Sequence, residues 1–245
     1  MPSAGPTTAG ALFASLVPIE RAIANPATTV ASLMAGGAAE QHDLGILASH
    51  PDWVASMPGS TPPGVRQAVL ASVSADTELG RIPASGPTPS TIPPWRILTP
   101  RPSAELLADY AAAAASSGVP WQVLAAIHLI ESRMGRIRGP SSAGAQGPMQ
   151  FLPSTWADFG AGGDIWADRD AIMAAGRFLH AHGAPGNIAA AVFAYNPSSH
   201  YVNAVLGYAS VMTANPRAFY SFYGWQVYVA TTAGEFILPE GFSAT

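Results

Sequence analysis

Apolar positions recur at helical spacing through most of residues 103–215, which predicts an all-α region. The expected helices run over 103–117, 120–135, 168–182, 188–195 and 199–212. A further, short helix is expected to begin near Ser154. Most begin at a residue whose side chain can cap a helix, namely Ser103, Asp168, Asn187 and either Ser198 or Ser199. From Phe222 to Leu238 the apolar positions alternate, which predicts two strands around a turn at 232–235. The expected fold class is therefore mainly α, with a small C-terminal β-hairpin.

The chain before residue 103 has a different character. Residues 1–81 are rich in Ala, Ser, Gly and Pro, and their pattern predicts two or three short helices, of which 65–79 is the clearest. Residues 82–102 contain seven prolines, a density that prevents helix and favours an extended connector. Trp95, Ile97 and Leu98 predict that the second half of this connector packs against a domain. The expected organisation is an N-terminal segment over 1–81, a connector over 82–102 and a main, largely helical domain over 103–245.

The most informative residue is Glu131, near the end of the helix expected at 120–135. Helical spacing places it on one face with three apolar residues: Leu124, Ile127 and Met134. A carboxyl group on such a face is costly to ionise, and the negative end of the helix dipole adds to that cost. Both effects predict a raised pKa, which suits a general acid. The alternative is a solvated side chain, or one paired with Arg133, Arg136 or Arg138.

Composition excludes several other classes of function. The chain of 245 residues is 49% hydrophobic and only 11% charged, and its net charge of −4 argues against a nucleic-acid partner. It has no Cys, so disulfides and cysteine chemistry are excluded. No apolar run is long enough for a transmembrane segment, and no basic residue precedes Arg21 to suggest a signal peptide. His180 and His182 do not share a helix face, so we expect no metal site, and His128 is expected to be a core or cleft-edge residue.

Three motifs follow in a fixed order around Glu131. The first is Glu131-Ser132, the second is the glycine-rich stretch from Ser141 to Thr155, and the third is Ala194-Tyr195-Asn196. Glycine-rich loops let the backbone approach a ligand closely, and Gln150 offers the donor and acceptor that a sugar acetamide or hydroxyl requires. In order and spacing these motifs resemble the soluble lytic transglycosylase (SLT) family, which is related in fold to goose-type lysozyme. The resemblance covers roughly residues 103–215, and the tail over 222–239 resembles actinobacterial members more weakly.

The resemblance implies a lysozyme-like helical domain and a reaction that needs no cofactor. Members of the family cleave the β-1,4 bond between N-acetylmuramic acid and N-acetylglucosamine in peptidoglycan, and leave a 1,6-anhydromuramoyl end. Glu131 matches the single catalytic glutamate. The sugar site would be lined by Ser141, Met149, Gln150, Tyr195 and Asn196. Tyr195 would orient Glu131 or the sugar, a helix-end cap is the alternative role for Asn196, and Ser132 is expected to bond to backbone.

One carboxyl group is chemically sufficient for this reaction. Ordinary glycosidases need a second carboxylate to activate water or to attack the sugar. Here the nucleophile is the substrate's own C6 hydroxyl, which is present at high effective molarity. Among the nearby acids, Asp168 and Asp170 are expected at a helix start, whereas Asp164 stays open as a second acid.

Two departures from the family pattern affect the expected sugar site. Pro148 stands where the family often has Leu, and Pro197-Ser198 replaces the common Ala-Gly. Neither removes a reactive group, so they are expected to alter only the shape of the subsites. The alternatives to a transglycosylase are a muramidase that uses water and a non-catalytic protein that binds cell walls. An extracytoplasmic location is expected with any of them, and the N-terminal segment is a candidate contact for cell-wall machinery.

Overall fold

The first part of the chain forms long helices. The computed structural model describes residues 5–83 and 86–244, and its N-terminal helices are α1 (Ala9–Ala24), α2 (Val30–Ser49) and α3 (Pro63–Gly80), with a 3-10 turn at Pro51–Ser56. Thr8 and Thr29 cap the first two by accepting from Ala11 N and Ser32 N. The prediction of short helices was wrong for α1 and α2. Pro18 lies inside α1, where local rules place a break, and the alanine and glycine of α2 give little periodic signal.

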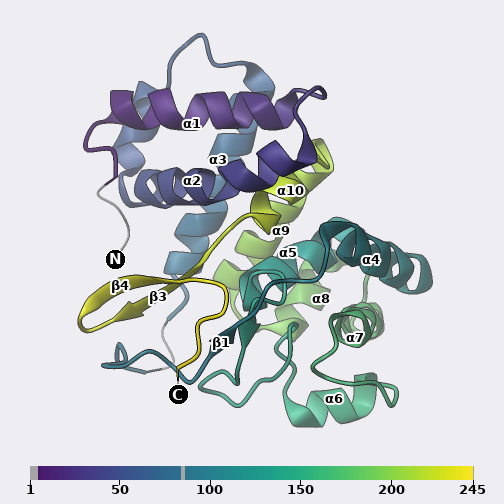
Figure 1. Cartoon of the computed structure of the whole chain (residues 1–245). Coiled ribbons are helices and arrows are strands. Elements are labelled where there is room, and N and C mark those ends of the chain that lie inside the picture. The colour runs from purple at the N-terminus through teal and green to yellow at the C-terminus, as the bar shows by residue number, and fades with distance from the viewer. Residues whose placement is uncertain (1–4, 84–85, 245) are drawn as a thin grey trace.

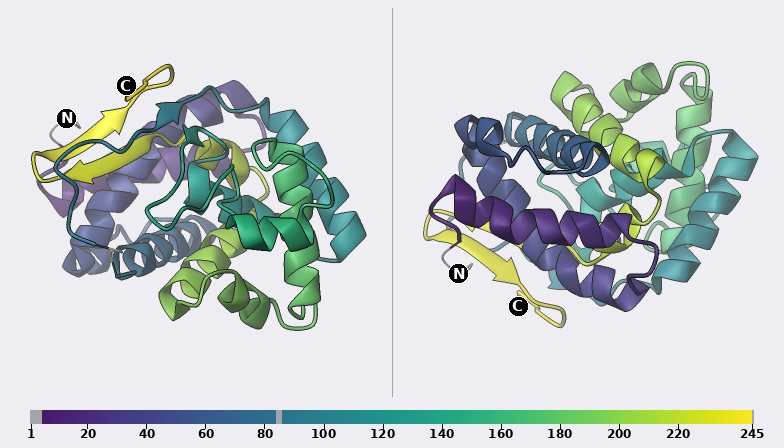
Figure 2. Two further views of the ribbon diagram at one scale, coloured as in Figure 1. Left: turned by 90° about the horizontal axis from the view of Figure 1, so that it is seen from below. Right: turned by 90° about the horizontal axis from the view of Figure 1, so that it is seen from above.

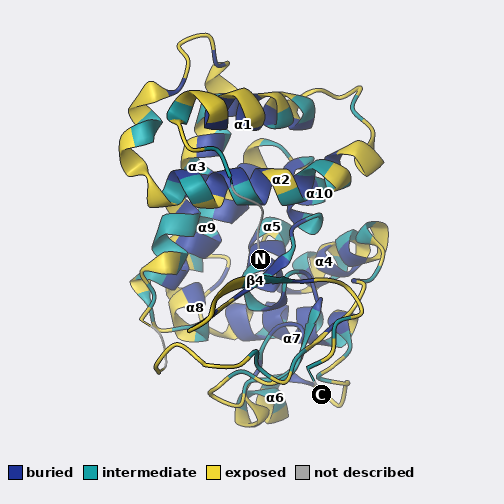
Figure 3. Cartoon of the chain, turned by 60° about the vertical axis from the view of Figure 1, so that its left-hand side comes forward, coloured by how far each residue is buried: buried dark blue, intermediate teal, exposed yellow. Residues whose placement is uncertain are grey.

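These helices share one hydrophobic core with the rest of the chain. The core joins Leu12, Leu44 and Val69 to Tyr110, Leu124 and Phe219, so residues 5–81 are not packed apart from 103–244. Figure 1 shows α1 to α3 on one side of α9 and α10, with α4 to α8 on the other. Figure 3 shows the buried residues on the inward faces of these helices.

A glycine contact fixes the approach of α2 to the C-terminal region. A Cβ on Gly37 would lie 2.2 Å from Ser221 O, and one on Gly224 would lie 2.1 Å from Met34 O. Neither space admits a side chain. The two backbones therefore meet directly, which brings the acidic residues of α2 against α10 (Ala218–Tyr223).

The helices after residue 103 follow the predicted order. They are α4 (Ser103–Ser117), α5 (Trp121–Ser132), α6 (Pro153–Phe159), α7 (Asp168–Ala181), α8 (Ile188–Tyr195) and α9 (Ser199–Ala214). Asn187 and Ser198 cap α8 and α9 as expected. Ser103 and Asp168 do not cap. Each is the first helical residue, with no side-chain hydrogen bond to its helix.

The connector and the C-terminal tail pack together. Strand β1 (Arg96–Ile97) pairs antiparallel with β2 (Ile137–Arg138), and β3 (Val227–Thr231) pairs antiparallel with β4 (Gly234–Leu238). Ile97 is buried in a small cluster with residues of the hairpin, as the connector's apolar residues predicted. Figure 2 shows the hairpin beside the connector.

The hairpin is confirmed, with its turn inside the predicted 232–235 segment. It begins at Val227 instead of Phe222, because Phe222 belongs to α10. The chain is thus mainly helical with a small C-terminal antiparallel hairpin.

Candidate active site

Glu131 lies in the last turn of α5, and its carboxyl group faces α9. Tyr201, buried in the first turn of α9, donates its hydroxyl to Glu131 Oε1 at 2.5 Å. Leu124, Ile127 and Met134 are fully buried, so the predicted apolar face is confirmed, and Glu131 is the partly exposed member of it.

The three nearby arginines are engaged elsewhere. Arg133 lies over the Trp225 ring, Arg136 reaches Glu240, and Arg138 bonds to Asp168. Within residues 5–83 and 86–244, no ion pair involves Glu131. Its only hydrogen-bond partner in this part of the chain is the tyrosine, so the ion-paired alternative is not what the structure shows.

Burial raises the pKa of Glu131 from 4.5 to about 7, although the hydrogen bond from Tyr201 works in the opposite direction. A hydroxyl donor stabilises the ionised carboxylate, whereas loss of water destabilises it, and here the loss of water is the larger effect. The carboxyl group is therefore partly protonated at neutral pH. This state suits a general acid that must afterwards act as a base.

The end of α5 is shaped by three consecutive residues with positive φ. They are Arg133, Met134 and Gly135, at 53°, 58° and 81°. A Cβ on Gly135 would lie 2.2 Å from Asp168 Oδ1, so only glycine fits there. The helix ends at Ser132, three residues before the glycine that was predicted to stop it. The two non-glycine residues with positive φ lie two and three positions after the candidate acid, and backbone strain of this kind often occurs at functional sites.

Ser132 ties the glycine-rich loop to this helix end. Its hydroxyl donates to Pro148 O at 2.5 Å and accepts from Gly135 N at 3.0 Å. The prediction that Ser132 bonds to backbone is confirmed. The sequence motif that follows Glu131 in the chain is therefore held directly beside it in space.

Two side chains in the loop shape its backbone. Ser141 Oγ accepts from Ala143 N and Ala145 N, which closes a turn. Gln150 has a φ of 48°, and its Nε2 donates to Gly147 O at 2.8 Å. Both side chains are partly exposed. The Ser141 hydroxyl hydrogen and the Gln150 carbonyl oxygen are the groups that these bonds leave for a ligand.

Tyr195 lies near Glu131 but does not bond to it. Its hydroxyl donates to Met149 O at 2.5 Å, and burial together with the charge of Glu131 raises the pKa of Tyr195. The Met149 side chain is fully buried, so it packs the core and offers no surface to a sugar. Phe151 is buried in the core, whereas Leu152 is 44% exposed.

Asn196 follows the end of α8 in extended backbone. Its backbone nitrogen donates to Val192 O at 3.1 Å, which fits the alternative role of a helix-end cap. Its side chain is partly exposed. The structure thus brings Glu131, Tyr195 and the loop around Met149 together, through Ser132 and the Tyr195 hydroxyl.

Sequence reasoning missed Tyr201, the residue that contacts Glu131 directly. Tyr201 and Tyr208 are seven residues apart on α9, so they lie on one helix face, and each donates its hydroxyl to a carboxylate: Glu131 and Asp76 respectively. This spacing was available in the sequence as a signal.

A buried set of polar side chains links α5 to its neighbouring helices α4 and α7. Tyr110 Oη lies 2.7 Å from His128 Nδ1, and His128 Nε2 lies 3.3 Å from Asp168 Oδ1. His128 is fully buried, so its expected place in the core is confirmed. Arg138 also contacts Asp168 at 3.2 Å. Asp168 is thus occupied in holding α5 and α7 together.

The other candidate acids hold the loop between α6 and α7. Asp164 Oδ1 accepts from Trp166 N, and Asp170 Oδ2 accepts from Asp164 N. Neither contributes to the pKa of Glu131. In the described part of the chain, no group of three or more acidic, His or Cys side chains is arranged to hold a metal ion.

The comparisons with known proteins give no relative. No family model, no curated protein and no solved structure matches the chain. Among the described residues, no helix combines the length and apolar character needed to span a bilayer.

Replacing Tyr201 by phenylalanine is expected to raise the pKa of Glu131 further, because it removes the donor that favours the ionised form. Hydrogen bonds to charged groups are worth about 1.5–3 kcal/mol, which corresponds to a rise of roughly one to two units in the pKa of Glu131. Carbon-13 NMR titration of the glutamate side chains would measure it. Tyr195→Phe is the matched control, since its hydroxyl bonds to Met149 O. An equal rise in both variants would contradict the role given to Tyr201.

Proposed function

We propose that the protein is a lytic transglycosylase that cleaves the bond between N-acetylmuramic acid and N-acetylglucosamine in peptidoglycan. The observation that carries the proposal is Glu131, whose pKa is raised to about 7 by burial. At neutral pH much of this group is protonated, so it can donate a proton to the glycosidic oxygen. The lysozyme-like architecture suggested by the motifs in residues 103–245 is part of the same proposal.

In the proposed reaction, Glu131 acts twice. It first protonates the leaving oxygen as the bond to the muramoyl C1 breaks, which leaves Glu131 ionised. Tyr201 stabilises this carboxylate through its hydroxyl. The carboxylate then takes the proton of the C6 hydroxyl as the C6 oxygen attacks C1. The proton on Glu131 is restored, and the product carries a 1,6-anhydro ring.

The electrostatic environment of Glu131 favours this route over hydrolysis. Burial raises its pKa and the Tyr201 hydrogen bond lowers it, and no carboxylate of the described residues is among the causes of the shift. Hydrolysing glycosidases generally place two carboxyl groups about 5–10 Å apart on either side of the bond. An internal nucleophile removes that requirement, because the C6 hydroxyl is held beside C1 by the sugar itself.

Sugar binding is assigned to polar groups of the glycine-rich loop and of the residue that follows α8. The Gln150 carbonyl oxygen, the Ser141 hydroxyl and the Asn196 side chain are partly exposed and suit the acetamide and hydroxyl groups of the substrate. Tyr195 is assigned to positioning through the Met149 carbonyl. Peptidoglycan lies outside the cytoplasmic membrane, so the proposal implies that the protein acts there.

The mass of the products tests the proposal. Purified cell walls digested with the full chain are expected to release fragments that are one water lighter than hydrolysis products, as mass spectrometry would show. Fragments of the hydrolysed mass would instead identify a muramidase. Binding to the walls without any release would identify a non-catalytic binding protein. Either result would overturn the proposal.

A further inference from the structure

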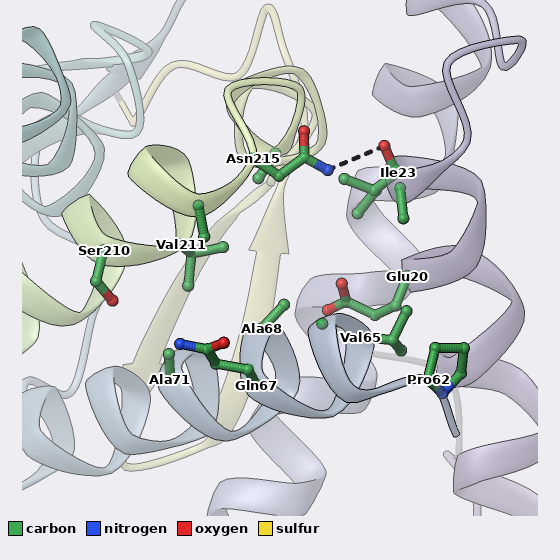
Figure 4. Close-up of a pocket in the computed structure, with 14 residues that line it drawn as sticks. Glu20, Ile23, Pro62, Val65, Gln67, Ala68, Ala71, Ser210, Val211 and Asn215 are labelled. Carbon is green, nitrogen blue, oxygen red and sulfur yellow. Dashed lines mark hydrogen bonds between the residues drawn. The ribbon is translucent and has the colours of Figure 1, made fainter. Parts of the chain in front are cut away.

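Apart from the site around Glu131, a cavity lies between α1, α3 and α9. Its volume is about 380 Å³. Buried residues form its floor, among them Ile23, Val65 and Val211, and exposed residues such as Gln67 and Ser210 lie at its rim. Figure 4 shows these side chains around the cavity. The lining is mainly apolar, and the rim opens to solvent.

The one acidic group of the lining is Glu20 on α1. It is only 4% exposed, and its Oε1 has no hydrogen-bond partner. Figure 4 shows its carboxyl group extending from α1 toward Val65 and Ala68 on α3, inside the ring of lining residues. Among the described residues no side-chain donor bonds to Glu20, and a buried polar group without a donor is rare and costly, so its position at a cavity points to a ligand that supplies one.

Glu20 is joined to a second buried acid. A carboxyl hydrogen bond links it to Glu40 on α2, and Glu40 Oε2 also accepts from Ser221 Oγ at 2.5 Å and Trp225 Nε1 at 3.0 Å. Burial and the neighbouring charge of Glu40 raise the pKa of Glu20 well above 4.5. The two donors on Glu40 favour its ionised form, so Glu20 is the member of the pair that holds the proton.

This acid pair has no positive partner in the described residues. Arg21 donates to Ser60 O, and Arg217 donates to Ile23 O and Thr28 O. No ion pair joins Glu20 or Glu40 to a cation, and the charge of Asp76 adds to the negative potential at Glu40. A cation that entered the cavity would therefore supply the charge that the fold itself leaves out.

We propose that this cavity binds a small primary amine with a compact apolar body. The apolar part lies against Ile23, Val65 and Val211, and the ammonium group donates to the Glu20 carboxyl group. Glu20 releases its proton to solvent when the ammonium binds, and the resulting carboxylate pairs with the cation. A neutral alcohol can offer one donor to the same carboxyl group, but it leaves the pair of acids without a positive charge.

Calorimetric titration of the full chain at pH 7 with benzylamine, and with benzyl alcohol for comparison, tests the proposal. Benzylamine is expected to bind about tenfold to a hundredfold more tightly, because hydrogen bonds to charged groups are worth about 1.5–3 kcal/mol. Repeating the titration in buffers of different ionisation enthalpy should reveal the released proton. Equal affinities, no detectable binding of the amine, or binding without proton release would overturn the proposal.

Two variants locate the binding. Glu20→Gln keeps a donor toward Glu40 and an oxygen toward the cavity, and it should abolish the preference for the amine. Ala68→Phe fills the cavity and leaves both acids present in the chain. It tests the site even if the first variant fails to fold, and it should remove binding of both probes. Leu70→Phe, at an exposed position of α3, is its control and should leave binding unchanged. Amine binding that survives Ala68→Phe in the folded protein would refute the site.

Discussion

Replacing Glu131 by glutamine is expected to abolish cleavage of cell-wall glycan while the fold is retained. Glutamine has nearly the same shape and keeps an oxygen that can accept from Tyr201, but it can neither donate nor take up the proton that the proposed reaction moves twice. A positioned acid–base group contributes about a hundredfold to ten-thousandfold. Since Glu131 serves both steps, the rate is expected to fall by roughly a thousandfold or more. Release of soluble fragments from purified walls measures the loss.

The matched control for this variant is Glu235→Gln, at an exposed position of β4 beside the turn of the hairpin. It removes one negative charge at a site that the proposed reaction does not use, so full activity is expected. Circular dichroism of both variants establishes that each is folded. Full activity in folded Glu131→Gln would end the assignment of Glu131 as the acid, whatever products the wild-type protein forms.

The local features of the site were predictable because they depend on residues close together in the chain. Helical spacing identified the apolar face that contains Glu131, and the glycine-rich motif after it identified the loop. The identity of its hydrogen-bond partner was not accessible in the same way. Tyr201 is 70 residues away from Glu131, and only the packing of α5 on α9 brings the two together.

The N-terminal acids were missed for a related reason. Glu40 sits in α2, which is rich in small residues and shows weak hydrophobic periodicity, whereas Glu20 shares a face of α1 with Leu16 and Ile23. In both helices an acidic side chain suggests a solvated face. The burial of Glu40 depends on the C-terminal region, since Ser221 and Trp225 lie more than 180 positions along the chain from it. Sequence patterns report which face of a helix is apolar, but they do not report which distant segment covers it.

The stability of the protein should also depend on the charge of Glu131. Its pKa is about 7 in the folded chain against an ordinary value of 4.5, so below pH 4.5 the carboxyl group is neutral in both states and costs nothing. As the pH rises from 4.5 to 7 the unfolded chain ionises first, which favours unfolding, and the loss is complete above about 7. A difference of roughly 2.5 units corresponds to about 3 kcal/mol.

Glutamine at position 131 cannot ionise, so the variant escapes this loss. Its free energy of unfolding, relative to wild type, should increase by about 3 kcal/mol between pH 4 and pH 8. Urea titrations of both proteins across this range measure the difference, in which the contributions of Glu20 and Glu40 cancel. Glu235→Gln controls for the lost charge. The variant that is inactive should thus be the more stable one above neutral pH, because a carboxyl group held away from water for proton transfer destabilises the fold whenever it ionises. A difference that stays constant with pH, or that reverses in sign, would show that Glu131 is solvated and unsuited to act as the acid.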